Sequence, residues 1–348
     1  MSASVFPSLG WSSESDSAIM RAVKPLIVLG GPIHPDGMTQ LEAEATVIVT
    51  DATSEAGMIA AAKDAEGILF RSKPDCTRSL MAACPKLKVV GRHGVGLDIV
   101  DLPAATDLGV AVVHAPGSNS NSVAEHAIML MLACAKQAVV VDQRTRKADW
   151  GKGRWQGLFE MNGKTLGIIG VGNIGRRVAK TAGALGMRVI GYDKYVPADE
   201  MRNRGVEPMP DMASVLRQAD VVTCHTPHTK ETHHMIDAAA VAQMKDGVIF
   251  VNTSRGKTQD ENALVAGLES GKIRAAGIDV FEEEPASSDN RFFQLENVIV
   301  SPHIAGVTRE STRNTALQVT AEMLRVLRGE KPHVLGNPDL WPRLGHLK

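Results

Sequence analysis

The sequence predicts an α/β fold in which two doubly wound parallel sheets share one chain of 348 residues. Short apolar runs alternate with helix-like segments up to about residue 115, and the same alternation restarts at Lys164 with a glycine-rich turn. Strands and helices that alternate in this way form a parallel sheet covered by helices. The chain is long enough for two such domains.

The first series contains five predicted strands and ends in a predicted crossing to the second series. Residues 115–122, Ala-Pro-Gly-Ser-Asn-Ser-Asn-Ser, are turn formers and predict that crossing. The apolar residues 123–141 then predict one long buried helix, inside the protein or at a subunit interface. Glu125, His126 and Lys136 within this stretch disfavour a membrane span. The five strands are predicted at 26–29, 47–49, 68–70, 89–90 and 110–113, with helices such as 54–63 and 78–83 between them.

The second series predicts strands at 164–170, 188–192, 221–224, 248–252, 275–280 and 298–301. A final helix at about 309–327 is predicted to pack back on the first unit, which makes that unit discontinuous. The predicted domains are therefore 1–118 with 306–348, and 119–305. The Ser-rich first 24 residues lack the apolar core of a secretory signal and are predicted to be poorly ordered.

The composition favours a cytoplasmic protein without a nucleic-acid or membrane partner. The net charge of −1 gives no reason to expect nucleic acid or an anionic membrane as a partner. Four cysteines without metal-like spacing are typical of reduced thiols in the cytosol. His225, His228, His233 and His234 cluster in sequence without a further ligand set, so no metal is predicted. The cysteines are Cys76, Cys84, Cys134 and Cys224.

The glycine turn joins a predicted strand to a predicted helix at 176–186, which is the dinucleotide-binding fingerprint of a Rossmann unit. Gly170 permits the tight turn, Gly172 lets a pyrophosphate approach the backbone, and Gly175 allows close packing of helix and strand. The phosphates would lie at the helix N-terminus, where free N–H groups and the helix dipole favour anions. The turn reads Gly170-Val171-Gly172-Asn173-Ile174-Gly175.

Asp193 follows the next strand, 18 residues after Gly175. A carboxylate at this place can bind both hydroxyls of an adenosine ribose and repels a 2′-phosphate, so NAD is favoured over NADP. Nearby Lys194, Arg202 and Arg204 could offset that repulsion. The alternative is that Asp193 only begins a turn.

Arg255, Glu284 and His303 each follow a predicted strand of the second unit, where ligands of open parallel sheets bind. Their types suit the reduction of a 2-oxo acid by a nicotinamide cofactor. A histidine supplies the proton, a carboxylate stabilises the imidazolium, and an arginine holds the substrate carboxylate. Each residue alone has a structural explanation, and their shared location favours the functional one.

With these motifs the sequence resembles the D-isomer-specific 2-hydroxyacid dehydrogenases. That family includes phosphoglycerate dehydrogenase, hydroxypyruvate and glyoxylate reductases and D-lactate dehydrogenase. The resemblance runs from about Leu26 to Leu335. It rests on the glycine turn and on Gly91-Arg-His-Gly-Val-Gly-Leu-Asp98, Asn121-Ser-Val-Ala-Glu-His126, Thr253-Ser-Arg-Gly256, Asp279-Val-Phe-Glu-Glu-Glu-Pro285 and Ser301-Pro-His-Ile304.

The resemblance implies a Rossmann NAD-binding domain inserted into a flavodoxin-like substrate domain. It implies a homodimer formed through the NAD-binding domain, and it identifies Arg255, Glu284 and His303 as catalytic, with Glu282 and Glu283 incidental. Substrate contacts are implied at Arg71, Ser72, Val95, Gly96 and Arg255. Cofactor contacts are implied at Gly170, Gly172, Asn173, Ile174, Gly175, Asp193, His225, Thr226, Pro227, Thr253, Ser254, Asp279 and His303, with Asp279 near the nicotinamide amide.

Three departures refine these expectations. The chain ends about forty residues after His303, which leaves no room for the C-terminal regulatory domain of some phosphoglycerate dehydrogenases. His93 stands where a smaller residue is frequent, which leaves the pocket size open. Glu125, rather than a glutamine, precedes His126 and argues against the related formate dehydrogenases.

The leading function is an NAD-dependent oxidoreductase that interconverts a small D-2-hydroxy acid and its 2-oxo acid. Hydroxypyruvate, glyoxylate and 3-phosphoglycerate are the candidate substrate types. Arg71 would meet a phosphate or a second carboxylate in one interpretation, and would form a structural ion pair in the other. The alternative function is an NAD-sensing interaction protein, as in the corepressors that keep the same site residues.

Overall fold

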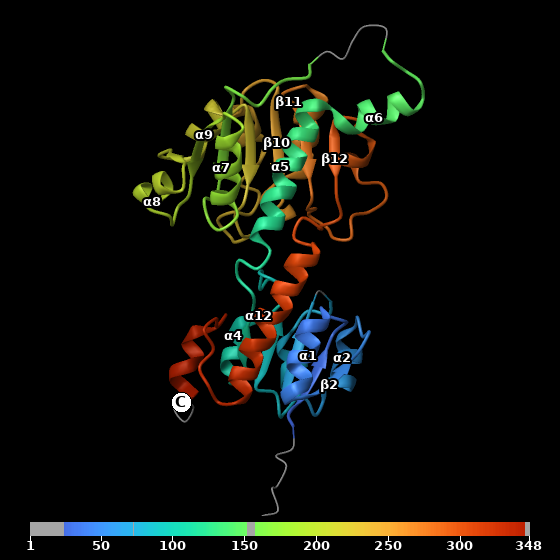
Figure 1. Cartoon of the computed structure of the whole chain (residues 1–348), viewed down its shortest axis with the longest axis vertical. Helices are drawn as coiled ribbons and strands as arrows, with labels where there is room; N and C mark the ends of the chain where they lie inside the picture. The colour runs from blue at the N-terminus through green and yellow to red at the C-terminus, as the bar shows by residue number, and fades with distance from the viewer. Residues whose placement is uncertain (1–23, 72, 152–156, 345–348) are drawn as a thin grey trace, which may run out of the picture.

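The computed structural model describes residues 24–71, 73–151 and 157–344, so the predicted disorder at the N-terminus and the substrate contact at Ser72 lie outside it. Two lobes follow one another along the long axis of the molecule (Figure 1). One is built on a five-stranded sheet and the other on a seven-stranded sheet, and every strand pair in both is parallel. The predicted fold class is confirmed.

The five-stranded sheet has the strand order β2-β1-β3-β4-β5. Apolar side chains pack on both of its faces, so the sheet divides two hydrophobic cores. Its strands are β1 (Leu26–Leu29), β2 (Thr46–Val49), β3 (Gly67–Phe70), β4 (Val89–Arg92) and β5 (Ala111–Val113). One face carries α2 (Glu55–Ala62), α3 (Arg78–Ala82) and α4 (Leu102–Asp107), and the other carries α1 (Pro35–Glu44) and α12 (Arg309–Leu327).

Helix α12 comes from the end of the chain and completes the first lobe, beside α1 (Figure 1). Its N-terminus is fixed by a capping box between Thr308 and Ser311. A β-carbon at Gly91 would lie 2.4 Å from the sulfur of Met323, so the glycine lets this side chain pack directly on β4. On these contacts we propose domain boundaries near residues 118 and 306.

The seven-stranded sheet has the order β12-β11-β10-β9-β6-β7-β8. Along β10, Ile249 and Val251 enter the core on one face while Val248 and Phe250 enter the core on the other. The strands are β6 (Thr165–Ile169), β7 (Arg188–Tyr192), β8 (Glu207–Pro208), β9 (Val221–Cys224), β10 (Val248–Asn252), β11 (Ile273–Ile278) and β12 (Val298–Val300). One core includes α5 (Ser120–Lys136), α7 (Gly175–Ala184) and α8 (Ala198–Asn203), and the other includes α9 (Met212–Gln218), α10 (Ala238–Gln243) and α11 (Glu261–Glu269). Three short 3-10 helices, η1 (Gly256–Thr258), η2 (Arg291–Gln294) and η3 (Pro338–Leu344), complete the described chain.

The single helix predicted over 123–141 is wrong in its second part. Helix α5 ends at Lys136 because Gln137 adopts the left-handed conformation, with φ 47°, and α6 (Ala138–Arg146) begins after it. Helix α6 buries none of its residues and projects beyond the seven-stranded sheet (Figure 1). Among the described residues no single helix is long and apolar enough to span a membrane; α5 and α6 pass that test only as a pair bent by 59°.

The chain passes between the lobes twice, at residues 114–119 and 301–308, and the two crossings lie side by side. The hydroxyl groups of Ser122 and Thr308 form a hydrogen bond of 2.8 Å beside the two crossings. A β-carbon at Gly306 would lie 2.6 Å from the side-chain amide of Asn119. The loops after β4 and β10 also meet here, since Arg255 Nη2 lies 3.1 Å from Asp98 Oδ2. The carboxyl ends of both sheets therefore face this junction.

Candidate active site

The three glycines of the turn after β6 have different surroundings. Gly170 has φ 92°, and a β-carbon there would lie 2.8 Å from the carbonyl oxygen of His225. A β-carbon at Gly175 would lie 2.2 Å from the carbonyl oxygen of Gly170, whereas one at Gly172 would meet nothing within 4 Å. Packing within the protein thus requires glycine at positions 170 and 175. Gly172 leaves the backbone open to a ligand, as the fingerprint predicts.

The N-terminus of α7 faces the same open space. Asn173 and Ile174 lie at this end of the helix, and no side chain caps it in the described chain. The N–H groups of Asn173, Ile174 and Gly175 donate to no acceptor among the described residues and are available to an anion, whereas those of the next two residues donate to Gly172 and Ile174. The turn has the shape and the donors that a pyrophosphate needs.

Asp193 both closes a turn and supports the glycine loop. Its Oδ1 accepts hydrogen bonds from the N–H groups of Tyr195 and Val196 at 2.8 and 3.0 Å, as the turn alternative predicts. Its Oδ2 accepts from the N–H of Val171 at 2.8 Å. Because a carboxylate oxygen accepts two hydrogen bonds, Oδ2 retains capacity for a ribose hydroxyl.

The three cations singled out near Asp193 are already paired with carboxylates. Lys194 Nζ lies 2.7 Å from Glu231, and Arg204 Nε lies 2.9 Å from Glu200. Arg202 pairs with Asp199. Because their charges are already balanced, these three side chains offset the negative charge of Asp193 only weakly, which disfavours a 2′-phosphate at this place.

The ends of β9 and β10 carry buried polar atoms without a partner in the described chain: His225 Nδ1 and Thr253 Oγ1. Burial lowers the pKa of His225 to about 3, so its ring is neutral. Ser254 differs, because its hydroxyl donates to Asn252 at 2.7 Å. Buried polar groups are almost always hydrogen-bonded, so unpartnered ones at a strand end indicate a place for a ligand. Thr226 and Pro227 continue the loop from His225 beside the glycine turn.

The structure brings His303 and Glu284 together, although nineteen residues separate them in sequence. His303 Nδ1 lies 2.7 Å from Glu284 Oε2, and Glu284 Oε1 accepts from the N–H of Phe281 at 3.0 Å. Burial alone would raise the pKa of Glu284, but the bonds from His303 and Phe281 outweigh it and hold that pKa below its usual value. Glu284 is therefore a carboxylate at neutral pH, facing an imidazole that is 45% exposed.

His303 adopts a left-handed backbone, with φ 53°. This conformation costs a non-glycine residue roughly 1–2 kcal/mol, so neighbouring contacts must hold it. The backbone N–H of His303 donates to the carbonyl of Asp279 at 2.7 Å. Such strain is common where a side chain must point in a direction that regular backbone cannot give.

Asp279 supports the loop of His303 from within the protein. Its side chain is fully buried, and its carboxylate accepts from Ser301 Oγ at 2.5 Å and from the N–H groups of Ile304 and Ala305 at 3.0 and 2.9 Å. The implied contact with the nicotinamide amide stays a prediction. The sequence gives no signal for the supporting role, since it depends on contacts across a turn.

Arg255 reaches from the end of β10 to the substrate loop of the other lobe. Its Nε and Nη2 donate to Asp98 Oδ2 at 3.2 and 3.1 Å, and a β-carbon at Gly96 would lie 2.0 Å from Nη2. The backbone N–H groups of Val95 and Gly96 donate to no acceptor in the described chain. A cation and two free donors therefore converge here. Sequence reasoning assigned no role to Asp98, although it ends one of the quoted motifs.

Arg71 and Arg92 add positive charge to the same end of the first sheet, beside His93. Arg71 is exposed and donates to the carbonyl of Pro32 at 2.9 Å, and it forms no ion pair with a described carboxylate. Arg92 Nε and His93 Nε2 are buried without partners in the described residues. Burial, assisted by Arg255 and Arg71, lowers the pKa of Arg92 to about 10; burial and Arg71 lower the pKa of His93 to about 4. This arrangement favours the anion-binding interpretation of Arg71.

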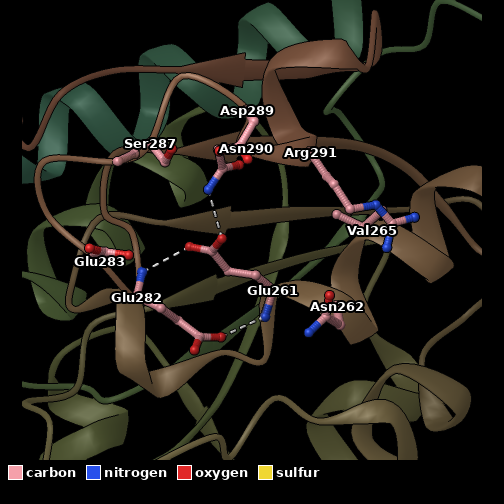
Figure 2. Close-up of a pocket in the computed structure, with 10 residues that line it drawn as sticks. Glu261, Asn262, Val265, Glu282, Glu283, Ser287, Asp289, Asn290 and Arg291 are labelled. Atoms are coloured by element: carbon pink, nitrogen blue, oxygen red, sulfur yellow. Dashed lines mark hydrogen bonds between the residues drawn. The ribbon is translucent and has the colours of Figure 1, made fainter.

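A pocket of about 440 Å³ lies beside the loop of Glu284 but has the wrong charge for an anionic substrate (Figure 2). Glu261 and Glu282 each accept a hydrogen bond from the other's backbone N–H at 2.8 Å, and Asn290 donates to Glu261 at 2.9 Å. Glu282, expected to be incidental, thus helps to fix the loop. No group of three metal-binding side chains is found in the described ranges. The pocket is lined by Glu261, Asn262, Val265, Glu282, Glu283, Ala286, Ser287, Asp289, Asn290 and Arg291.

Comparisons with known proteins agree with this geometry. Residues 128–305 match the family described as D-isomer specific 2-hydroxyacid dehydrogenase, NAD binding domain. The chain is 40% identical to D-3-phosphoglycerate dehydrogenase of Methanocaldococcus jannaschii over 324 residues, covering 92% of this chain and 62% of that protein. It is 39% identical to hydroxypyruvate reductase of Thermotoga maritima over 262 residues, covering 75% of this chain and 84% of that protein.

The solved structures agree as well. D-lactate dehydrogenase of Aquifex aeolicus, complexed with NAD and lactic acid, superposes with a TM-score of 0.77 at 29% identity, over 91% of this chain and 98% of that one. The chain spans half to about three fifths of the length of the phosphoglycerate dehydrogenases that it matches.

The chain belongs to the D-isomer-specific 2-hydroxyacid dehydrogenase family, and it carries that family's NAD-binding domain. NAD is therefore the cofactor of the seven-stranded lobe. The glycine turn, the uncapped N-terminus of α7 and the unpartnered atoms of His225 and Thr253 fit this cofactor.

Proposed function

We propose that the protein interconverts a small D-2-hydroxy acid and its 2-oxo acid with NAD. The observation that carries this proposal is the 2.7 Å contact between His303 and Glu284 at the junction to which Arg255 also reaches. A proton donor, its counter-charge and an anion-binding cation are the groups that reduction of a 2-oxo acid needs beside a nicotinamide.

In the reductive direction His303 donates a proton to the carbonyl oxygen of the substrate. Glu284 stabilises the imidazolium before the transfer and fixes the ring so that Nε2 faces the substrate. Arg255 and the N–H groups of Val95 and Gly96 bind the substrate carboxylate. The bound nicotinamide supplies the hydride. In the oxidative direction neutral His303 accepts the hydroxyl proton.

A substrate with a second anionic group fits this site best. Arg71 and Arg92 lie at the carboxyl ends of neighbouring strands, and neither pairs with a carboxylate in the described chain. An arginine binds a phosphate through a planar fork of donors. The related proteins named D-3-phosphoglycerate dehydrogenase support the same choice. The proposed substrate is therefore a phosphorylated three-carbon 2-oxo acid, preferred over hydroxypyruvate and glyoxylate.

The proposed assembly is a homodimer formed through the NAD-binding lobe. Helix α6 buries none of its residues in the chain itself, and Val139 of this helix is 44% exposed. Trp150, just beyond the helix, is 81% exposed. A projecting helix with exposed apolar side chains at its start and just beyond its end is suited to contact with a second copy.

The test is a panel of 3-phosphohydroxypyruvate, hydroxypyruvate, glyoxylate and pyruvate, each with NADH and with NADPH. We expect NADH oxidation to be fastest with the phosphorylated substrate and to be lost in His303→Ala. His333→Ala is the matched control, because His333 pairs with Glu322 at 3.2 Å in the other lobe. No NADH oxidation with any substrate, or full activity in His303→Ala, would contradict the proposal. Tight NADH binding without turnover, together with capture of a partner protein, would favour the NAD-sensing alternative.

A further inference from the structure

We infer that His126 is a positioning residue for His303, acting from α5 through Ser301 and Asp279. His126 Nε2 lies 2.9 Å from Ser301 Oγ, and Ser301 Oγ lies 2.5 Å from Asp279 Oδ1. The chain of contacts therefore joins a helix of the NAD-binding lobe to the loop that carries His303. The inference rests on the proposed function of His303.

The loop needs such an anchor because His303 is held in a left-handed conformation. Residues on both sides of it bind one fully buried carboxylate: Ser301 before it, and the N–H groups of Ile304 and Ala305 after it. If Asp279 turned, all of these contacts would shift together. The direction of the His303 ring thus depends on the direction of the Asp279 carboxylate.

The hydrogen-bond roles follow from the number of protons. Ser301 has one hydroxyl proton, and a carboxylate accepts but does not donate, so that proton goes to Asp279. The oxygen of Ser301 then accepts from His126, whose Nε2 must carry a hydrogen. His126 in this way fixes the hydroxyl that in turn fixes the carboxylate. His126 Nε2 also lies 3.7 Å from Asp279 Oδ1, so the imidazole fills the space beside both groups.

Helix α5 is a rigid base for this anchor. It packs on β10, β11 and α7, and ten of its residues are buried. His126 itself is largely buried, with 17% of its side chain exposed. Four residues earlier on the same helix, Ser122 bonds Thr308, which offers a second link to the crossing segment that does not lead to Asp279.

The experiment compares His126→Leu, His126→Gln and Ser122→Ala. A glutamine at this position keeps an N–H donor, so we expect His126→Gln to retain most of the activity. His126→Leu should lower kcat about fivefold, the factor of one lost hydrogen bond, with little change in KM for NADH. Its pH profile for reduction should move to lower pH, because His303 is held less firmly against Glu284. A purely structural role would leave that profile in place.

Two further measurements complete the test. Ser301→Ala removes the middle of the chain of contacts without a large change in volume, and its effect should not add to that of His126→Leu. Hydrogen–deuterium exchange of residues 301–305, which excludes Thr308, the partner of Ser122, should rise in both variants but not in Ser122→Ala. This measurement does not require enzymatic activity. Unchanged exchange and an unchanged pH profile in His126→Leu, or equal effects in Ser122→Ala, would overturn the inference.

Discussion

At the scale of single residues, the charge of each site residue depends on the balance between burial and its neighbouring groups. Glu284 is partly buried, which disfavours its charge, yet it remains ionised because His303 and a backbone N–H bind it. Arg255 is a cation that pairs with Asp98 of the other lobe. His93 is neutral because burial and Arg71 oppose its protonation.

Glu284→Gln tests the first of these balances. The amide keeps the size of the side chain and an acceptor for the N–H of Phe281, but it removes the charge that stabilises the His303 imidazolium. We expect kcat/KM for reduction near neutral pH to fall about 100-fold, the usual contribution of an acid–base group. The pH at half-maximal rate should also move to lower values. Glu283→Gln is the control, and an equal loss of activity there would contradict the assignment.

His93 gives a prediction for stability. Its folded pKa of about 4 lies below the unfolded value of about 6.5. Between these pH values the unfolded chain therefore binds a proton at His93 that the folded chain does not bind. The free energy of unfolding should therefore fall as the pH is lowered from about 6.5 towards 4. In His93→Gln this decline should be shallower. Urea unfolding at several pH values measures it, and parallel curves for the two proteins would show that His93 protonates freely when folded.

At the scale of elements, the strand–turn–helix unit of β6 and α7 separates packing from binding. Gly170 and Gly175 have no room for a β-carbon, whereas Gly172 has ample room on the side that would meet a cofactor. The same sequence motif thus contains two positions that exclude a side chain and one position that has room for it. Single Gly→Ala substitutions, each of which adds one methyl group, can test this difference.

Gly172→Ala should fold with near-normal stability but bind NADH at least about tenfold more weakly, because its methyl group occupies the approach of the pyrophosphate. Gly183→Ala is the control, since this position of α7 is also open. That helical substitution should stabilise the protein by about 0.5–1 kcal/mol and leave NADH affinity unchanged. Thermal unfolding with NADH titration distinguishes the two. Normal NADH affinity in Gly172→Ala would place the phosphates elsewhere.

At the scale of the whole molecule, two lobes meet at the carboxyl ends of their sheets, and each contributes groups that the other lacks. The seven-stranded lobe supplies His303, Glu284 and Arg255, while the five-stranded lobe supplies the free N–H groups of Val95 and Gly96. The contact between Arg255 and Asp98 joins them directly. Neither lobe alone holds the complete proposed site.

The proposed dimer is tested at α6. Val139→Asp should lower the molecular mass in solution from that of a dimer, twice 37.1 kDa, to that of a single chain. Light scattering after size exclusion measures this mass. A carboxylate in an apolar interface loses its water without gaining a partner. Ile48→Asp is the control, because Ile48 is similarly exposed on β2 of the other lobe. A dimer that survives Val139→Asp, or a monomeric wild type, would contradict this interface.

Local patterns in the sequence were sufficient for most elements. The final helix was predicted at 309–327 and lies at Arg309–Leu327, because its apolar period and its cap are both local. The break at Gln137 was not predictable, since no glycine or proline marks it. In the candidate site, the motifs led to His303 and Glu284, which the structure brings together, and their catalytic roles stay predictions. Asp98 and the anchoring role of Asp279 were missed, because each depends on a partner distant in sequence. Arg92 was missed because its burial without a partner for Nε depends on the tertiary structure.

Helix α12 has a consequence for biosynthesis. Val319, Met323 and Leu324 share a core with Ile27 and Leu29, so the part of this face that α1 leaves open stays uncovered on the ribosome until α12 has emerged. The inserted lobe has all of its own strands by Val300 and can close its cores earlier. The lobe whose synthesis starts first is therefore the one that finishes folding last.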